Sequence, residues 1–251
     1  MNSNIINKLK NVNGKIGFYY KNLTTNEEIS YNENETFLAA SVIKLPILAA
    51  VFQEAAKGKI NLSDMITVKH SDKVPSCGAL NQFTFEPTVD IRTLCRLMIV
   101  ISDNTATNVL INHLTIEKLS KEFNEIGLKN TKIKRLLFDS EASKQGKENK
   151  FAPKEIGNLL EHIFKRTFVN ENISKEMEDI LLEQQINHKI PGMLPDLKIA
   201  HKTGEDDGIT HDVGIVYSKK PFIIVFASND TDVPEFEQLI REISYELATV
   251  E

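Results

Sequence analysis

Hydrophobic and polar positions give the two ends of the chain the pattern of β-strands. Residues 14–23 read GKIGFYYKNL, a short apolar and aromatic run, and residues 28–31 follow after a polar turn, which predicts an N-terminal hairpin. Near the C-terminus the runs 198–203, 212–217 and 222–227 have the same character, and SKKP between the last two fits an antiparallel hairpin. The pattern therefore predicts strands at both ends of the chain.

Helical periodicity fills the residues between these strands. Residues 39–58 are apolar on almost every face of a helix, so we expect a buried helix that ends at Gly58. Further helical patterns cover residues 90–101, 104–114, 116–126, 154–165 and 174–185, and an amphipathic pattern covers residues 233–250. The most loop-like stretch is 140–149, SEASKQGKEN.

This order of elements predicts an α+β fold, an α/β sandwich with an antiparallel sheet built from both chain ends and an inserted, mainly α lobe. We place the sheet-containing lobe at residues 1–40 and 191–251 and the helical lobe at residues 41–190. Because a cleft between two lobes is a natural ligand site, we expect one functional unit with its active site between them.

Composition and charge exclude several classes of protein. The 251 residues carry a formal net charge of −5 with both signs scattered along the chain, which argues against a nucleic-acid partner. No apolar run reaches the length of a membrane span. The N-terminus lacks a signal-peptide pattern, so the chain as written is expected to be cytoplasmic, and a cloned mature form of a secreted protein would begin in the same way. Cys77 and Cys95 have no Cys or His companions and are expected to be free thiols, with no metal and no cofactor.

Three polar motifs carry the candidate chemistry. SxxK occurs at Ser41 to Lys44, SDN at Ser102 to Asn104, and KTG at Lys202 to Gly204, each once in the chain. SxxK alone carries little weight, but the three motifs in this order are a strong signal. Residues i and i+3 of a helix share one face, so the Lys44 amine is expected to reach the Ser41 hydroxyl, which needs a base to become a nucleophile.

The other two motifs have both functional and ordinary interpretations. Between two helices, SDN residues commonly serve as helix caps, and at a strand end, KTG commonly forms a turn. Functionally, Lys202 offers a cation and Thr203 a hydroxyl to a substrate carboxylate, while Gly204 allows close approach of a ligand. The N–H of Glu205 is a candidate partner for that of Ser41 in an oxyanion hole.

With these motifs the chain resembles the class A serine β-lactamases and related penicillin-recognising serine hydrolases. The resemblance implies the β-lactamase/transpeptidase-like fold and a serine hydrolase that opens the β-lactam amide through an acyl-serine intermediate. It implies Ser41 as the nucleophile, Lys44 as a proton acceptor and Ser102 as a proton relay. It also implies that Asn104 binds the substrate amide and that Lys202 and Thr203 hold the substrate carboxylate.

The chain departs from this family where the deacylating water is activated. The family's ExxLN glutamate is absent: Arg135 fits the basic residue before it, but Leu136 and Leu137 occupy the expected positions. The nearest carboxylates are Asp139 and Glu141, which remain candidates for the base. Without a placed base the acyl-enzyme is expected to persist, so a slowly deacylating penicillin-binding protein, a D,D-peptidase or an esterase are the alternatives, as is a sensor in which acylation is the signal.

Two smaller features complete the prediction. Glu205 follows KTG, where relatives carry a small residue, so its carboxylate is expected to weaken the binding of anionic substrates, and Glu205→Ala to improve it. His201 and His211 flank KTG and are expected to have ordinary strand or loop roles. The expected partner is a small-molecule substrate, a β-lactam or related amide or ester, and the expected state is a monomer.

Overall fold

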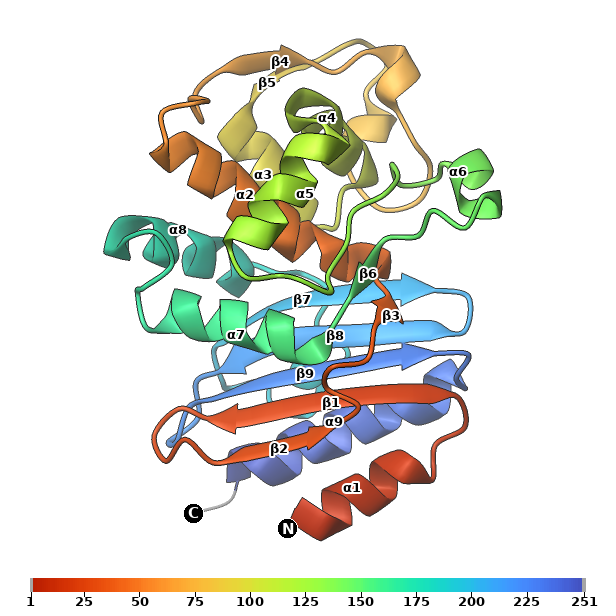
Figure 1. Ribbon diagram of the computed structural model, residues 1–251, viewed down its shortest axis with the longest axis vertical. Coiled ribbons are helices and arrows are strands. Elements are labelled where there is room, and N and C mark those ends of the chain that lie inside the picture. Colours follow the sequence, from red (N-terminus) through yellow and green to blue (C-terminus); the bar gives the residue numbers. More distant parts are fainter. Residues whose placement is uncertain (1, 250–251) are drawn as a thin grey trace.

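Five strands from the two ends of the chain form one antiparallel sheet, as the sequence predicts (Figure 1). The computed structural model describes residues 2–249. The sheet has the order β2-β1-β9-β8-β7 and consists of β1 (Lys15–Asn22), β2 (Glu28–Tyr31), β7 (Ile199–Asp206), β8 (Ile209–Val216) and β9 (Phe222–Asn229). Two small pairs join β3 (Phe37–Leu38) to β6 (Lys150–Phe151) and β4 (Met65–Thr67) to β5 (Thr88–Asp90).

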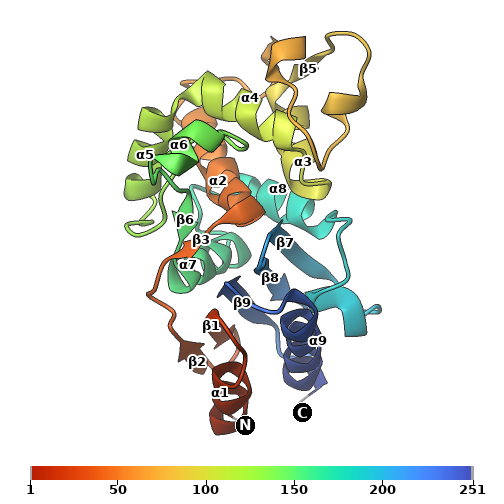
Figure 2. The same ribbon diagram turned by 90° about the vertical axis from the view of Figure 1, so that its right-hand side faces the viewer.

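Helices cover both faces of this sheet (Figures 1 and 2). On one face α1 (Asn2–Lys10) and α9 (Val233–Thr249) pack on Phe18 and Phe226, and on the other α7 (Pro153–Phe164) packs on Tyr19. Successive residues of a strand point to opposite faces, so Phe18 and Tyr19 belong to different cores. At the closest approach of α7 to β1, a Cβ on Gly157 would lie 2.3 Å from the Tyr19 ring, which explains the glycine.

The helical lobe lies beyond α7 and is organised around one buried helix (Figure 1). It contains the helices α2 (Lys44–Ala56), α3 (Ile91–Val100), α4 (Asn104–Leu114), α5 (Ile116–Glu125), α6 (Ser140–Lys144) and α8 (Glu171–Leu182). Short 3₁₀ turns are η1 (Ala40–Ile43), η2 (His70–Asp72), η3 (Leu80–Gln82) and η4 (Ile190–Met193). All residues from Lys44 to Phe52 are buried, which agrees with an α2 sequence that has no polar face.

Several predicted boundaries were wrong, three of them near the candidate site or at a helix cap. The α-helix that follows β3 begins at Lys44 rather than near Ser41, which lies in the 3₁₀ turn η1. Strand β7 continues to Asp206, so KTG lies inside a strand and not at its end. Helix α8 begins at Glu171, where Asn170 accepts a hydrogen bond from the Ile173 N–H as its N-cap. The α1 helix was not predicted.

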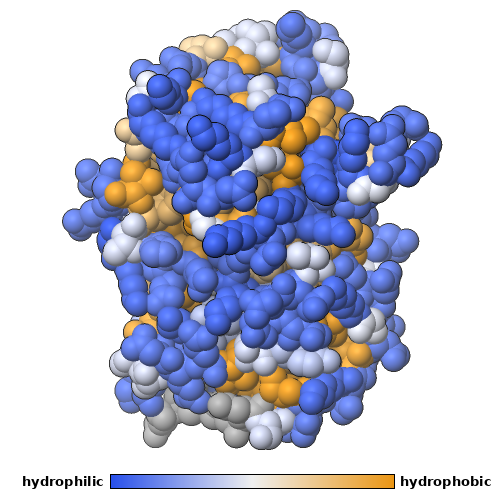
Figure 3. Space-filling view, in the orientation of Figure 1, coloured by the Kyte–Doolittle hydropathy of each residue, from blue (hydrophilic) through white to orange (hydrophobic). Residues whose placement is uncertain are grey.

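The remaining expectations concern the surface and the cysteines. No helix in residues 2–249 is long and apolar enough to span a membrane. Cys77 is exposed and Cys95 is buried, and both are free thiols, as expected. The face seen in Figure 3 is mainly hydrophilic, with apolar residues scattered among charged ones.

Candidate active site

Ser41 and Lys44 meet because a 3₁₀ turn joins them. In a 3₁₀ helix the side chains at i and i+3 lie directly above one another, and η1 places Ser41 three residues before Lys44, the first residue of α2. The Lys44 Nζ lies 2.9 Å from the Ser41 Oγ. The predicted contact between nucleophile and base is therefore present, although its geometry comes from a 3₁₀ turn rather than an α-helix.

The Lys44 side chain is fully buried and surrounded by four oxygen atoms. Its Nζ lies 2.8 Å from the Ser102 carbonyl oxygen and 2.7 Å from the Asn104 Oδ1, and both of these atoms only accept hydrogen bonds. It also lies 2.9 Å from the Ser102 Oγ. A neutral Lys44 amine has two N–H bonds and one lone pair. When the two N–H bonds donate to the Ser102 carbonyl and the Asn104 Oδ1, the lone pair can accept the proton of a serine hydroxyl. This arrangement is suited to taking a proton from Ser41.

Burial and charge favour that neutral form. Desolvation lowers the pKa of Lys44 well below its ordinary value, and the neighbouring Lys202 lowers it further. A base that is largely deprotonated at neutral pH is what a serine nucleophile requires.

The SDN motif divides between structure and chemistry. Ser102 has a φ of 55°, a left-handed conformation that few non-glycine residues adopt, and its Oγ lies between two amines, 2.9 Å from the Lys44 Nζ and 3.1 Å from the Lys202 Nζ. Asp103 is buried and caps α4 by accepting from the Ala106 N–H at 2.8 Å. The capping interpretation thus holds for Asp103, while Ser102 faces the two lysines.

Asn104 is also held by the protein. Its Oδ1 accepts from Lys44, and its Nδ2 donates to the Pro75 carbonyl at 3.3 Å. In this arrangement the side chain orients the base, and its predicted contact with a substrate amide remains a prediction.

The KTG motif lies on β7, the edge strand of the sheet, next to η1. A Cβ on Gly204 would lie 3.2 Å from the Val42 backbone nitrogen, a tight contact, so the glycine helps the strand to approach the nucleophile turn closely. Lys202 is fully buried, and its Nζ donates to the Thr203 carbonyl at 2.8 Å. Burial lowers the pKa of Lys202 to about 7, with Asp212 opposing the shift and Lys189 adding to it.

These residues open onto a cavity of about 760 Å³ between the helical lobe and the sheet. Its lining includes residues of all three motifs, namely Ser41, Ser102, Asn104, Thr203 and Gly204, together with Glu205. Opposite them lies the segment 135–149, which contributes Arg135, Leu137, Phe138, Asp139, Ser140, Ser143, Glu148 and Asn149. The structure therefore brings six of the predicted site residues together at one cavity, and the buried amines of Lys44 and Lys202 contact its wall through the Ser102 Oγ.

The segment 135–149 fixes Leu137, one of the two leucines at the positions where the resemblance leads us to expect a glutamate. The Leu137 N–H donates to the Asn108 Oδ1 at 2.8 Å, and the Asn108 Nδ2 donates to the Leu137 carbonyl at 3.0 Å. The neck of the segment is closed by Arg135, whose Nη2 lies 2.8 Å from the Glu148 Oε2. Both candidate leucines pack against the core, and only Leu137 also lines the cavity.

The two candidate carboxylates near this segment have other partners. Asp139 lines the cavity and caps α6, with its Oδ1 2.9 Å from the Ala142 N–H. Glu141 has a side chain that is 76% exposed and pairs with Lys144 at 2.8 Å. Among residues 2–249, therefore, no carboxylate hydrogen-bonds to Ser41, whose Oγ is hydrogen-bonded to the Lys44 Nζ.

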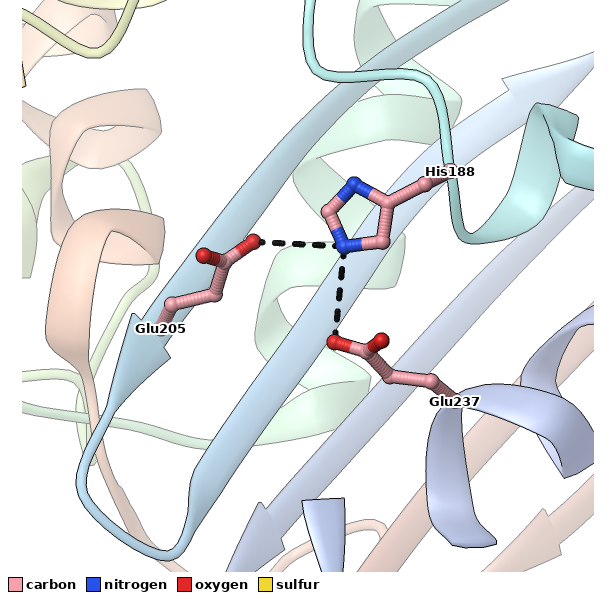
Figure 4. A group of neighbouring side chains, drawn as sticks. All are labelled: His188, Glu205 and Glu237. Atoms are coloured by element: carbon pink, nitrogen blue, oxygen red, sulfur yellow. Dashed lines mark hydrogen bonds and ion pairs between the residues drawn. The ribbon is translucent and has the colours of Figure 1, made fainter. Parts of the chain in front are cut away.

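Glu205 belongs to a charged cluster at the edge of the sheet (Figure 4). His188 lies between Glu205 and Glu237, with its Nε2 3.6 Å and 3.4 Å from their Oε1 atoms. The buried Lys189 Nζ lies 2.9 Å from the Glu205 Oε1 and 3.8 Å from the Glu237 Oε1. Although burial alone would raise it, Lys189 lowers the pKa of Glu205. Lys189 thus balances the charge of Glu205, which reduces the repulsion expected from the sequence.

The two histidines beside KTG have structural roles. His201 is bonded to Asp212 at 2.9 Å and to Asn187 at 2.9 Å, and His211 contacts the Leu38 carbonyl at 2.8 Å. Burial lowers the pKa of His211 to about 3, so it is neutral at ordinary pH. Two residues of the site, Asn108 and Lys189, were not predicted, because neither stands in a motif.

Comparisons with known proteins agree with this site. A family model described as the β-lactamase enzyme family matches residues 2–250. β-Lactamase VEB-1 of Pseudomonas aeruginosa is 26% identical over 96% of this chain and 86% of its own length.

Solved structures extend the agreement to the fold. PBP-A has a TM-score of 0.89 at 27% identity, covering 98% of this chain and 94% of its own, and a mutant of it is known as an acyl-enzyme complex with penicillin G. A β-lactamase from Sphaerobacter thermophilus has a TM-score of 0.87 at 23% identity, covering 98% of this chain and 95% of its own. The predicted β-lactamase/transpeptidase-like fold is confirmed. With a family model matched over nearly its whole length, the chain belongs to the β-lactamase enzyme family.

Proposed function

We propose that this protein is a serine hydrolase that opens the β-lactam amide through an acyl-serine intermediate at Ser41. The observation that carries the proposal is the environment of Lys44, a buried amine 2.9 Å from the Ser41 Oγ with two obligate acceptors on its other side. Membership of the β-lactamase enzyme family supports it.

In the acylation step the neutral Lys44 amine takes the Ser41 proton while the Ser41 Oγ attacks the β-lactam carbonyl carbon. The resulting oxyanion needs hydrogen-bond donors, and the N–H groups of Ser41 and Glu205 are the candidates at this end of the cavity. Lys202 and Thr203 hold the carboxylate of the substrate, as the motif predicts.

Collapse of the tetrahedral intermediate breaks the carbonyl–nitrogen bond, and the leaving nitrogen needs a proton. Ser102 is placed to deliver it, because its Oγ lies 2.9 Å from the Lys44 Nζ that has just become charged. The proton taken from Ser41 thus reaches the leaving nitrogen through Lys44 and Ser102, and the products of this step are an ester at Ser41 and an opened ring.

Hydrolysis of that ester is the slower step in this proposal. Leu137 stands where relatives place the glutamate that activates water, and its side chain has no proton acceptor. Water must then be activated by a group less suited to the task, so we expect turnover with an acyl-enzyme that accumulates during the reaction.

Incubation with benzylpenicillin, followed by intact mass and substrate loss together, tests the proposal. We expect an adduct of one penicillin per chain that decays as product forms. Ser41→Ala should show neither adduct nor turnover, whereas Ser63→Ala, a change at an exposed serine outside the cavity, should behave as the wild type.

The outcomes separate the possibilities. Rapid substrate loss without a lasting adduct would show β-lactam hydrolysis with fast deacylation, and the base that activates the deacylating water would still have to be identified. A permanent adduct without turnover would make the protein a penicillin-binding protein. An unchanged mass with no substrate loss, or labelling of Ser41→Ala, would overturn the proposal.

A further inference from the structure

The cavity carries charges of opposite sign at its two ends. At the inner end, behind Ser102, lies the buried amine of Lys202, whose Nζ is 3.1 Å from the Ser102 Oγ. At the mouth, the segment before α6 contributes Asp139, and the β7–β8 turn contributes Asp206 and Asp207. In Figure 1, α6 and the β7–β8 turn lie on the same side of the molecule, the right-hand side of the view.

The other charges that line the cavity are balanced within the protein. Glu148 pairs with Arg135 at 2.8 Å, and Glu205 pairs with Lys189 at 2.9 Å. Arg135 is the one cationic side chain among the lining residues that the structure describes, and it is engaged in its own ion pair. The described lining residues therefore include no unpaired cation that could balance the carboxylates at the mouth.

Two of the three aspartates at the mouth accept a hydrogen bond from a backbone N–H. Asp139 accepts from the Ala142 N–H, and the Asp206 Oδ1 accepts from the Asp207 N–H at 2.9 Å. Over residues 2–249 no ion pair involves Asp139, Asp206 or Asp207. Asp139 and the pair Asp206 and Asp207 thus place three carboxylates without a cationic partner on two segments that line the cavity.

We propose that this cavity selects zwitterionic substrates, namely β-lactams that carry an ammonium group on the acyl side chain in addition to the ring carboxylate. The proposal rests on the proposed function, because it assumes that the carboxylate binds at Lys202 and Thr203. The acyl side chain, at the other end of the substrate, then extends to the mouth. There Asp206, Asp207 and Asp139 attract a cation and repel a second carboxylate.

The field acts mainly on encounter and loose binding, since the aspartates are partly in water. Clefts lined by one sign of charge change association rates by about 10-fold or more, and salt screens the effect over about 8 Å at physiological ionic strength. The preference for an ammonium group should therefore weaken as salt is added. A preference based on the shape of the cavity would not depend on salt.

Three penicillins that differ only at one carbon atom of the side chain provide the test. Ampicillin carries an ammonium group there, benzylpenicillin a hydrogen and carbenicillin a carboxylate. The measured quantity is the second-order rate constant for acylation of Ser41 at low and high salt, at a pH where the ampicillin amine is charged. We expect ampicillin to exceed carbenicillin by about 10-fold at low salt, with benzylpenicillin between them.

Substitutions of the aspartates at the mouth test whether these residues cause the preference. Asp206→Asn and Asp207→Asn, alone and with Asp139→Asn, should reduce the ratio of ampicillin to carbenicillin toward one. Asparagine retains the side-chain oxygen that accepts the backbone hydrogen bonds, and melting temperatures check that the fold is kept. Asp196→Asn removes an exposed charge outside the cavity and should leave the ratio unchanged.

A ratio near one in the wild type, or a ratio that the triple variant leaves unchanged, would overturn the selectivity while Ser41 acylation still holds. If no penicillin acylates Ser41, the proposed function fails and the selectivity fails with it. The two failures are distinguishable because benzylpenicillin reports acylation independently of the side-chain charge.

Discussion

The two buried lysines of the site need opposite protonation states. Lys44 must be neutral to accept a proton, whereas Lys202 must be charged to hold a carboxylate. Burial gives Lys202 a pKa of about 7, so it is charged below that pH and becomes neutral as the pH rises through it. We therefore predict that the noncovalent affinity for benzylpenicillin falls above about pH 7.

The prediction is checked by the dissociation constant of the noncovalent complex, taken from the concentration dependence of the acylation rate at several pH values. The methyl ester of the same penicillin serves as the control, because it has no carboxylate for Lys202 to hold. An affinity for benzylpenicillin that stays constant up to pH 9 would contradict this role for Lys202.

The sequence predicts the residues that are part of motifs and misses those that position them. Ser41, Lys44, Ser102 and Lys202 were predicted from three short motifs and from the family that these motifs resemble, since chemistry restricts which residue types fill such positions. Asn108, which holds the Leu137 backbone, has no such signature, because an asparagine in a helix has many ordinary roles. A position of this kind becomes visible only when the chain is folded.

At the scale of elements, the segment 135–149 forms part of the wall of the cavity that contains Ser41. Its neck is closed by the Arg135–Glu148 pair, and Asn108 fixes Leu137 at the cavity wall. We predict that Leu137→Glu shortens the lifetime of the penicilloyl adduct by about 100-fold, the lower range for general base catalysis. The measurement is the decay of the adduct mass after excess penicillin is removed.

Leu136→Glu provides the matched control. This neighbour packs against the core rather than lining the cavity, so the same carboxylate should lower stability without shortening the lifetime of the adduct. An equal effect of both substitutions, or no effect of a stably folded Leu137→Glu, would show that the segment does not position the deacylating water.

The start of α4 also organises the loop beside it. Asp103 accepts from the Ala106 N–H and, with its other oxygen, from the Ala79 and Leu80 N–H groups at 2.7 Å and 2.9 Å. Asp103→Ala removes a cap and leaves two further donors unsatisfied, so we predict a loss of about 3 kcal/mol in the free energy of unfolding, measured with urea.

Asp90→Ala is the comparison for this loss. Asp90 caps α3 through Thr93 alone, so its removal should cost only about 1 kcal/mol. Equal losses in the two variants would mean that the bonds from Asp103 to Ala79 and Leu80 contribute nothing to stability.

Periodicity predicts long elements better than short ones. The helices α3, α4, α5, α7 and α9 and the strands β1, β2 and β9 were predicted close to their observed bounds, because each carries a repeated apolar pattern. Strands β7 and β8 were predicted with one bound three residues short, and the two-stranded pairs were missed. Helix α1 was missed because its nine residues contribute only a narrow apolar stripe, with Ile5 and Leu9 buried against the sheet. The 3₁₀ turn η1 was missed because its sequence continues directly into α2.

At the scale of the whole molecule, the sheet belongs to two cores at once. Adjacent residues of β1 and β9 face the helical lobe on one side and α1 with α9 on the other. The catalytic residues are divided in the same way, with Ser41 and Ser102 in the helical lobe and Lys202 on β7. Unfolding of either lobe would therefore remove part of the candidate active site.

We predict that the protein unfolds in a single transition in urea, in which acylation of Ser41 by benzylpenicillin is lost together with secondary structure. Leu110→Ala in α4 and Ile240→Ala in α9 remove fully buried side chains from the two different cores, and each should cost about 2–5 kcal/mol. Because the strands join the cores, both variants should shift the same transition, followed by far-ultraviolet circular dichroism and by acylation. A variant that splits the transition in two, with acylation surviving the first step, would show that the lobes are stable independently of each other.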